Sequence, residues 1–357
     1  MNGMRFVFAD SGKAIDASVA KQLMNAYAPS SMALSLLMRD RLPMGWGLFD
    51  EVMRYAILAR MVVYSEPFDV IHAHDWLSIA AGMEAKRISG KPLIVHMHAT
   101  EFDRTGGTAN DAVYEIERTG MEAADRVVAV SDYTKNIIIN RYGITPEKIE
   151  VVYNGIDPDD AVVAAPFASI SARKRMGEKI VLFVGRLTLQ KGPDYFLRAA
   201  KRALSKDPRL QFVISGAGDM QERLMQEAAA LGIADRVFFV GFLRGAELAS
   251  AYRMADVVVM PSVSEPFGIV PLESLLNGTP VILSKQSGVS EVIRHALKVD
   301  FWDTDAMAER IIAATRYSAL STTLSENGRR EAGLVNWQKA AQQCILIYNR
   351  IRGLLRP

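Results

Sequence analysis

The chain of 357 residues exceeds one typical domain and is long enough to bury two separate cores. Lys and Arg number 42 against 40 Asp and Glu, which excludes the strong positive field typical of proteins that bind nucleic acid or anionic membranes. The single cysteine, Cys344, excludes a disulfide framework, and no basic region followed by an apolar run opens the sequence. We therefore expect a cytoplasmic two-domain α/β enzyme that acts on a small molecule.

The first part of the chain has less regular patterns than the rest. Residues 5–10 (RFVFAD) suggest a strand, and Met-rich helical patterns follow at 32–38 and 51–64, in which we interpret the methionines as core residues. Four short apolar runs then alternate with amphipathic segments, as parallel strands covered by helices on both faces do. These predicted strands span residues 68–74, 92–98, 125–131 and 147–153. All apolar runs are far shorter than the roughly 20 residues of a membrane helix.

The second half repeats this alternation after a segment without periodicity. Residues 154–177 are rich in Asp, Pro, Ala and Ser, as expected of a hinge. The predicted strands beyond it span residues 179–185, 210–216, 236–241, 256–261 and 280–284. The sequence therefore predicts two tandem Rossmann-like α/β domains with doubly wound parallel sheets. We place the domains at residues 1–158 and 178–338, the hinge at 159–177, and at 339–357 a C-terminal helix that packs back on the first domain.

Two basic residues follow the first strand of the second half. Ligands of open parallel sheets gather beyond the carboxyl ends of the strands, so the turns there are the first places to search. Arg186 emerges where the strand ends, and Lys191 follows in a loop before a helix that begins near Pro193. Two cations beside a helix start can neutralise a diphosphate leaving group, although two solvated loop charges have the same pattern.

Acidic residues follow the strand 256–261. Glu265 lies in the loop, Gly268 opens the next helix, and Glu273 lies one to two turns further on. Carboxylates at these positions can accept hydrogen bonds from sugar hydroxyls, but the helix dipole alone also favours acidic residues there. A glycine turn at Gly216 and Gly218 could let backbone approach a ligand, or could be only a tight turn between strand and helix.

Four motifs in this order resemble a known family. VGRL…KG, VISGAGD, VGF and EPFGIVPLE are similar to the large retaining glycosyltransferase family of glycogen synthases, sucrose synthases and many mannosyltransferases, the family 4-like group, from about residue 68 to about 350. The resemblance implies the GT-B fold and a nucleotide diphosphate sugar as donor. It implies that Arg186 and Lys191 bind the diphosphate, that Glu265 contacts the transferred sugar, and that Glu273 binds the ribose. The donor-binding set that it implies is Gly185, Gly216, Gly218, Phe267, Gly268, Ile269, Val270 and Glu273.

Four of the five histidines form two H-x-H pairs at the ends of predicted strands, His72 with His74 and His96 with His98. Members of a pair lie on one face of a strand, so a metal site is conceivable, and with Asp75 and Asp103 it would suit a metal-dependent hydrolase. Histidines in a sheet covered on both faces can also be core residues. The resemblance implies instead that His98 is the active-site histidine that hydrogen-bonds the donor sugar, with His74 and Asp75 lining the cleft.

Metal ions are not expected in the chemistry that the resemblance implies. The D-x-D runs at 157–159 and 303–305 lack the strand context of a metal motif, and we interpret Asp303 as a helix cap. Cationic side chains would replace a divalent metal and no cofactor would be needed. In the implied reaction, a hydroxyl of a carbohydrate or lipid-linked acceptor attacks the donor sugar from the front face as the nucleotide diphosphate leaves, which retains the anomeric configuration. VIHAHDW favours glucose as the transferred hexose, and UDP, ADP and GDP remain alternatives for the nucleotide.

The start of the chain departs from the family pattern. Members open with a strand and a glycine-rich loop, whereas here only Gly3 and Gly12 precede the helical segment, and Gly45-Trp46-Gly47 does not follow a strand. We expect either an abbreviated first domain or a numbering that begins inside a longer protein. With an abbreviated domain we expect slow transfer or leaky donor hydrolysis, and a Met-rich segment at 32–64 that covers an exposed face or forms a homodimer contact. A degenerate protein that binds nucleotide sugars without transferring them is an alternative.

Overall fold

The computed structural model describes residues 47–157 and 177–354, which form two compact units. The first unit contains the described residues up to His96, together with Ala112–Val128 and the chain from Tyr348 onwards. The second contains Met97–Asp111 and Ala129–Ile347. The predicted strand at 5–10, the glycines before Gly47, the Met-rich run at 32–38 and almost all of the predicted hinge lie outside the described residues.

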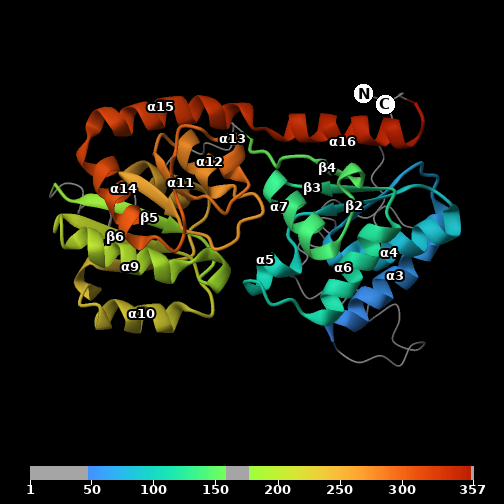
Figure 1. Ribbon diagram of the computed structural model, residues 1–357, viewed down its shortest axis with the longest axis horizontal. Coiled ribbons are helices and arrows are strands. Elements are labelled where there is room, and N and C mark those ends of the chain that lie inside the picture. Colours follow the sequence, from blue (N-terminus) through green and yellow to red (C-terminus); the bar gives the residue numbers. More distant parts are fainter. Residues whose placement is uncertain (1–46, 158–176, 355–357) are drawn as a thin grey trace. The chain divides into compact units, whose positions relative to one another are not determined.

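A four-stranded sheet is built from the apolar runs of the first half, in the order β1-β2-β3-β4. Figure 1 labels β2, β3 and β4 of this sheet. Its strands are β1 (Ile71–His74), β2 (Leu93–Met97), β3 (Arg126–Ala129) and β4 (Ile149–Val151). β1 and β2 are parallel, with His74 opposite His96. Every residue of β2 is buried, as expected of a strand covered on both faces. All four predicted strands are confirmed, and each is shorter than its apolar run.

Helices and single turns fill the spaces between these strands. They are α3 (Leu48–Ser65), α4 (Asp75–Ser89), α5 (Glu101–Thr105), α6 (Asp111–Ala123), α7 (Asp132–Ile137), the π-helical η1 (Ile138–Tyr142) and the 3₁₀ turn η2 (Pro146–Lys148). α3 packs on α4 within the first unit. α4 ends at Gly90, whose φ of 66° lets the chain turn back towards β2.

The second half forms a six-stranded parallel sheet in the order β10-β9-β8-β5-β6-β7. The strands are β5 (Lys179–Val184), β6 (Leu210–Ser215), β7 (Val237–Gly241), β8 (Val257–Met260), β9 (Val281–Ser284) and β10 (Leu297–Val299). Five of them were predicted. β10 was not, because three residues with a lysine at the centre make no apolar run.

The remaining helices follow these strands along the chain. They are η4 (Leu189–Lys191), α9 (Pro193–Leu204), α10 (Gln221–Ala230), η5 (Ala234–Arg236), α11 (Gly245–Met254), α12 (Val270–Leu276), α13 (Val289–Val292), α14 (Thr304–Arg316), α15 (Ser318–Leu334) and α16 (Trp337–Ile351). Among the described residues, no helix is both long and apolar enough to cross a membrane.

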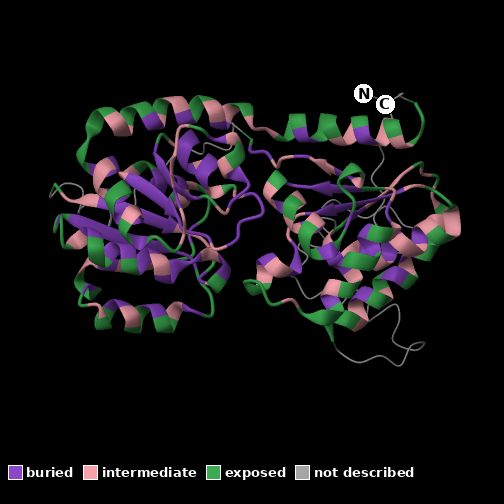
Figure 2. Cartoon of the chain, in the orientation of Figure 1, coloured by how far each residue is buried: buried purple, intermediate pink, exposed green. Residues whose placement is uncertain are grey.

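Alternation along the strands divides the core of the second unit into two layers. Val181 and Phe183 of β5 face α9, α10 and α14, whereas Ile180 and Leu182 face α11, α12 and α13. The strands are therefore buried on both sides (Figure 2). The two parallel sheets confirm the predicted fold class, and in the second unit the strand ends remain for polar chemistry.

Candidate active site

Three of the predicted residues follow two strands that lie side by side. Arg186 and Lys191 come after β5, and Glu265 comes after β8. β5 pairs with β8 on one side and with β6 on the other, so the path of the chain across the sheet reverses between β5 and β8. Connections diverge at such a switch point and leave a crevice beyond the carboxyl ends of the strands. The strand order alone thus directs both loops to one place.

The turn that carries Arg186 is held by backbone contacts with the turn after β6. Gly185 N donates to Ser215 O at 3.0 Å, and Leu187 N donates to Ala217 O at 3.0 Å. A Cβ atom on Gly216 would lie only 1.8 Å from Gly185 O, and Gly216 has a φ of 146°. The close approach of two turns therefore requires glycine here. Position 218 also requires glycine, because a Cβ atom there would lie 2.3 Å from the backbone oxygen of Leu187.

Lys191 forms an ion pair with Glu265. Lys191 Nζ lies 2.6 Å from Glu265 Oε2, and the Ser262 hydroxyl donates to the same oxygen at 3.0 Å. The side chain of Glu265 is 9% exposed and that of Lys191 is 21% exposed, so the carboxylate is buried beside its counter-ion. A buried carboxylate needs such partners. Neither contact uses Oε1, which can accept a hydrogen bond from a ligand.

Backbone hydrogen bonds fix the loop that carries Glu265. Glu265 N donates to Gln286 O at 3.0 Å, Gly288 N donates to Glu265 O at 2.9 Å, and Val263 N donates to Gln190 O at 2.9 Å. The last bond joins this loop to η4, next to Lys191. The amide oxygen of Gln190 also accepts a hydrogen bond from Arg186 Nη2 at 3.4 Å. The pair is therefore held from both loops before any ligand arrives, which is what electrostatic preorganisation requires.

The predicted donor-binding segment between Glu265 and α12 has one special backbone position. Gly268 has a φ of 101°, and a Cβ there would lie 3.0 Å from Glu265 Cγ, so glycine relieves both strain and crowding. The Phe267 side chain is buried in the core, whereas Ile269 is exposed and Val270 begins α12. Any contact of Phe267 with a donor would accordingly be made by its backbone.

Glu273 lies in the first turn of α12 and lines a cavity of about 380 Å³. The hydroxyl of Tyr252, from α11, donates to Glu273 Oε2 at 2.7 Å. Burial raises the pKa of Tyr252 well above its ordinary value, and the negative charge of Glu273 adds to this. Tyr252 therefore stays protonated and acts as a fixed donor, which orients the carboxylate in the cavity.

A buried carboxylate of α5 joins the same unit. Asp103 is fully buried and accepts hydrogen bonds from Thr100 N, at 2.7 Å, and from the Ser264 hydroxyl. The Ser264 hydroxyl also contacts the Tyr133 hydroxyl at 3.0 Å. Burial raises the pKa of Asp103, against the hydrogen bonds from Ser264 and Thr100. Sequence reasoning gave Asp103 a metal-binding alternative and missed Ser264. The T-x-x-D spacing of Thr100 and Asp103, typical of a helix N-terminus, was the available sequence signal that Asp103 has a structural role.

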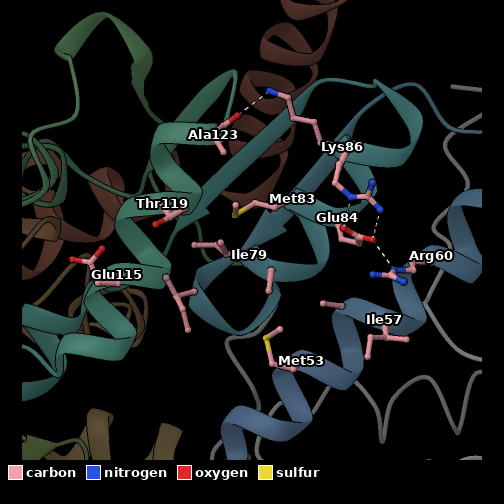
Figure 3. A pocket seen from close by; sticks show the side chains of 14 residues that line it. Met53, Ile57, Arg60, Ile79, Met83, Glu84, Lys86, Glu115, Thr119 and Ala123 are labelled. Carbon is pink, nitrogen blue, oxygen red and sulfur yellow. Dashed lines mark hydrogen bonds and ion pairs between the residues drawn. The ribbon is translucent and has the colours of Figure 1, made fainter. Parts of the chain in front are cut away.

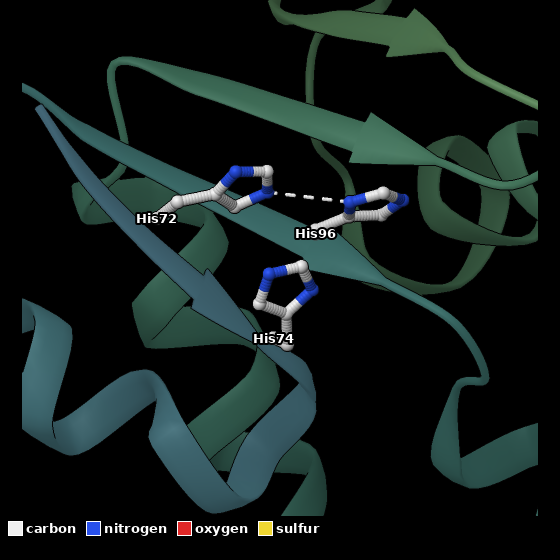
Figure 4. Close-up of side chains that lie close together, drawn as sticks. All are labelled: His72, His74 and His96. Carbon is white, nitrogen blue, oxygen red and sulfur yellow. Dashed lines mark hydrogen bonds between the residues drawn. The ribbon is translucent and has the colours of Figure 1, made fainter. Parts of the chain in front are cut away.

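The predicted histidines separate into two groups. Nitrogen atoms of His72, His74 and His96 lie within 4.8 Å of one another in the first unit (Figure 4). His98 follows β2 in the second unit and precedes α5, which packs against η4. The described residues that could share a metal ion are those three histidines, without Asp75, His98 or Asp103. The carboxylate-containing metal centre considered for a hydrolase is therefore not assembled as expected.

The second D-x-D run has the structural role that we expected. Asp303 Oδ1 accepts a hydrogen bond from Ala306 N at 2.9 Å and caps α14, and Asp305 forms an ion pair with Arg202. Of the first run, only Asp157 lies among the described residues.

A cavity of about 740 Å³ in the first unit lies between α3, α4 and α6 (Figure 3). Met53, Ile57 and Met83 make its wall apolar, and at its edge Glu84 forms ion pairs with Arg60 and Arg87. Hydrogen bonds from Arg87 lower the pKa of Glu84 to about 2. None of the predicted site residues lines this cavity.

Two family models and several solved structures match the chain. Residues 167–331 match the family described as "Glycosyl transferases group 1", and residues 38–160 match "Glycosyltransferase Family 4". HepE of Anabaena in complex with UDP superposes with a TM-score of 0.70 at 22% identity, covering 83% of this chain and 82% of HepE. Sucrose-phosphate synthase of Thermosynechococcus elongatus gives 0.72 at 24% identity, covering 88% and 81%. These likenesses show the GT-B fold.

Relatives in sequence define the family. An uncharacterised glycosyltransferase of Methanocaldococcus jannaschii is 38% identical over 238 residues, which are 64% of this chain and 61% of that protein. The D-inositol 3-phosphate glycosyltransferase of Kribbella flavida is 32% identical over 303 residues, which are 79% of this chain and 71% of that enzyme. The chain belongs to the family 4-like glycosyltransferases of GT-B fold. It spans less than two thirds of the M. jannaschii protein.

Proposed function

We propose that the protein transfers a hexose, glucose by preference, from a nucleotide diphosphate sugar to an acceptor hydroxyl, with retention of configuration and without a divalent metal. One observation carries the proposal: Lys191 and Glu265 meet at 2.6 Å at the switch point of the second sheet, in a loop system that also holds Arg186. Cations suited to a leaving group and a carboxylate suited to a sugar therefore lie in one loop system, which supports the proposal.

The diphosphate leaving group needs positive charge beside it. When the bond to the sugar breaks, negative charge grows on the diphosphate oxygens, and donors fixed in advance stabilise it most. Arg186 is exposed at the strand end and can offer paired N–H donors to a phosphate, whereas Lys191 acts as a point charge. In glycosyltransferases that use a metal, the ion supplies this charge. Two cations from neighbouring positions on one loop would replace it here.

The sugar becomes positively charged at the same moment. Glu265 Oε2 is engaged by Lys191 and Ser262, which leaves Oε1 to accept a hydrogen bond from a sugar hydroxyl. We assign His98 to a second hydroxyl of the same sugar, in line with its place before α5. A carboxylate already paired with Lys191 is a weak nucleophile, which favours front-face attack by the acceptor over a covalent intermediate.

The ribose would lie at Glu273. Tyr252 orients this carboxylate, which can accept hydrogen bonds from the ribose hydroxyls in the cavity of about 380 Å³. HepE has been solved with UDP and with UDP-glucose, which supports a nucleotide sugar and is consistent with glucose. The acceptor would be a hydroxyl of a carbohydrate or of a lipid-linked molecule.

Calorimetric titration of the full chain with UDP, ADP and GDP tests the binding half of this proposal. Incubation with UDP-, ADP- and GDP-hexoses, followed by NMR of the anomeric proton of the product, tests the reaction. We expect one nucleotide to bind and one donor to give a product with the anomeric configuration of the donor. An inverted product would contradict retention. Binding without turnover for every donor and acceptor would favour the degenerate alternative.

A further inference from the structure

Three histidines gather on one face of the first sheet. His72 and His74 are two positions apart on β1 and therefore point to the same side, and the parallel register puts His96 of β2 directly opposite His74. One nitrogen from each ring lies within 4.8 Å of the other two (Figure 4). All three residues belong to the first unit, whereas Arg186, Lys191 and Glu265 belong to the second. We propose that His72, His74 and His96 bind one divalent transition-metal ion, with zinc as the best fit.

The spacing of two nitrogens already matches a shared ion. His72 Nε2 and His96 Nδ1 are 3.2 Å apart. Two nitrogens bonded to tetrahedral zinc at about 2.0–2.1 Å stand roughly 3.3–3.4 Å apart. An ion can therefore bind between these two rings with little movement of either strand, once the rings tilt so that both lone pairs point to it.

His74 would provide the third ligand after a side-chain rotation. Its ring stacks on His72 with 4.3 Å between centroids and lies 5.2 Å from the His96 ring. His74 is exposed, so its ring can turn towards the ion at small cost. Its backbone is fixed, because His74 N donates to the Ser78 hydroxyl at 2.6 Å and Ser78 donates back to His74 O at 2.7 Å. The next residue, Asp75, has a φ of 56°, which fixes the sharp turn from β1 into α4.

A second contact directs the lone pair of His72 into the cluster. His72 Nδ1 lies 2.5 Å from the Tyr348 hydroxyl of α16. If Nδ1 carries the proton and donates a hydrogen bond to Tyr348, then the lone pair of His72 lies on Nε2, which faces His96. Histidines that bind metals commonly donate their other N–H to an oxygen in this way.

The ligand chemistry selects the class of ion. Three imidazoles suit zinc, cobalt, nickel and copper, whereas magnesium and calcium prefer oxygen ligands. A fourth position remains for water. The ion would tie β1 to β2 and, through His72, to Tyr348, so its role would be to clip the end of α16 to the sheet. This role is independent of the proposed transfer reaction.

Metal titration of untagged, chelator-treated full-length protein tests the proposal. We expect one Co²⁺ per chain, the visible absorption of a tetrahedral site, and its loss when Zn²⁺ displaces cobalt. Tyr348→Phe should weaken Zn²⁺ affinity about 10- to 100-fold, the scale of losing an outer-shell partner. His74→Asn removes a ligand at an exposed position and should cost at least about a hundredfold. Circular dichroism would verify that both variants fold.

The two other histidines provide matched controls. His98 lies outside the cluster, and His295 is bonded to Glu331 on another element. His98→Asn and His295→Asn should bind Zn²⁺ as tightly as the unaltered chain. Absence of stoichiometric binding, or a His74→Asn variant with unaltered affinity, would overturn the proposal. An equal loss in either control variant would also overturn it, since the ion would then bind elsewhere.

Discussion

The ion pair of Lys191 with Glu265 gives a prediction whose size follows from the structure. Two unit charges 2.6 Å apart attract each other by about 6 kcal/mol at an effective dielectric constant of about 20. Desolvation offsets much of this attraction. Loss of one partner costs about 3–5 kcal/mol in a fully buried pair and about 0–1 kcal/mol at the surface. Since Lys191 is 21% exposed, we expect Lys191→Met to lower the free energy of unfolding by about 2 kcal/mol, between these limits.

A double-mutant cycle measures the interaction free energy between Lys191 and Glu265 apart from the contacts that each makes with other residues. Glu265→Gln keeps an acceptor for Ser262 and lets Lys191 reach solvent, so it should cost about 1 kcal/mol. The double variant has no unpaired charge and should cost no more than about 2 kcal/mol, which gives a coupling of about 1 kcal/mol. Urea unfolding, followed by circular dichroism and tryptophan fluorescence, would measure all three. Turnover should fall about a hundredfold in each single variant.

A second ion pair in the same sheet is the matched control. Lys179 lies 3.1 Å from Asp256 and is 38% exposed, at the opposite end of β5 from Arg186. Lys179→Met should cost about 0.5 kcal/mol and leave turnover unaltered. Two outcomes would contradict the predicted coupling between Lys191 and Glu265. The first is that the losses of unfolding free energy in Lys191→Met and Glu265→Gln add within about 0.5 kcal/mol, and the second is that Lys179→Met loses as much stability as Lys191→Met.

Three further predictions concern catalysis. Arg186→Ala should lower turnover by roughly a hundredfold. The control variant Arg198→Ala, on the exposed side of α9, should keep the turnover of the unaltered chain. Equal rates in the two variants would show that Arg186 does not bind the leaving group. Glu273→Gln should chiefly raise KM, because a ribose contact acts before and during bond breaking alike, whereas Glu265→Gln should chiefly lower kcat. Parallel steady-state kinetics would decide, and equal changes in both parameters would contradict the division. Turnover should survive a strong chelator. Its abolition both in the unaltered chain and in His74→Asn, which lacks a ligand of the proposed histidine site, would show that a metal takes part in the transfer.

Local sequence predicted the strands and the loops of the candidate site, but it could not predict contacts between distant segments. Arg186 and Glu265 could be found because each follows an apolar run, and parallel strands end at one edge. The bond of Asp103 to Ser264 joins residues 161 positions apart and has no local signal. The histidine cluster depends on the register of β1 against β2, which a one-residue shift would destroy.

The glycine turn after β6 shows how the fold constrains the site, and it yields the last prediction. From the sequence, Gly216 could serve either a ligand or a tight turn. In the structure a Cβ at Gly216 would lie 1.8 Å from Gly185 O, next to Arg186, whereas a Cβ at Gly232, with a φ of 65°, meets nothing within 4 Å.

Both positions strain an alanine, but only the first forces another backbone to move. Gly232→Ala should therefore cost about 1–2 kcal/mol and leave nucleoside diphosphate affinity unaltered. Gly216→Ala should cost at least about 3 kcal/mol, since strain and displacement add, and if it folds it should bind the nucleotide more weakly because the Arg186 turn has shifted. Urea unfolding and calorimetric titration of the two variants would measure this. Equal stability and equal affinity would mean that the two turns can separate freely, and that Arg186 is not held in position by the backbone contact.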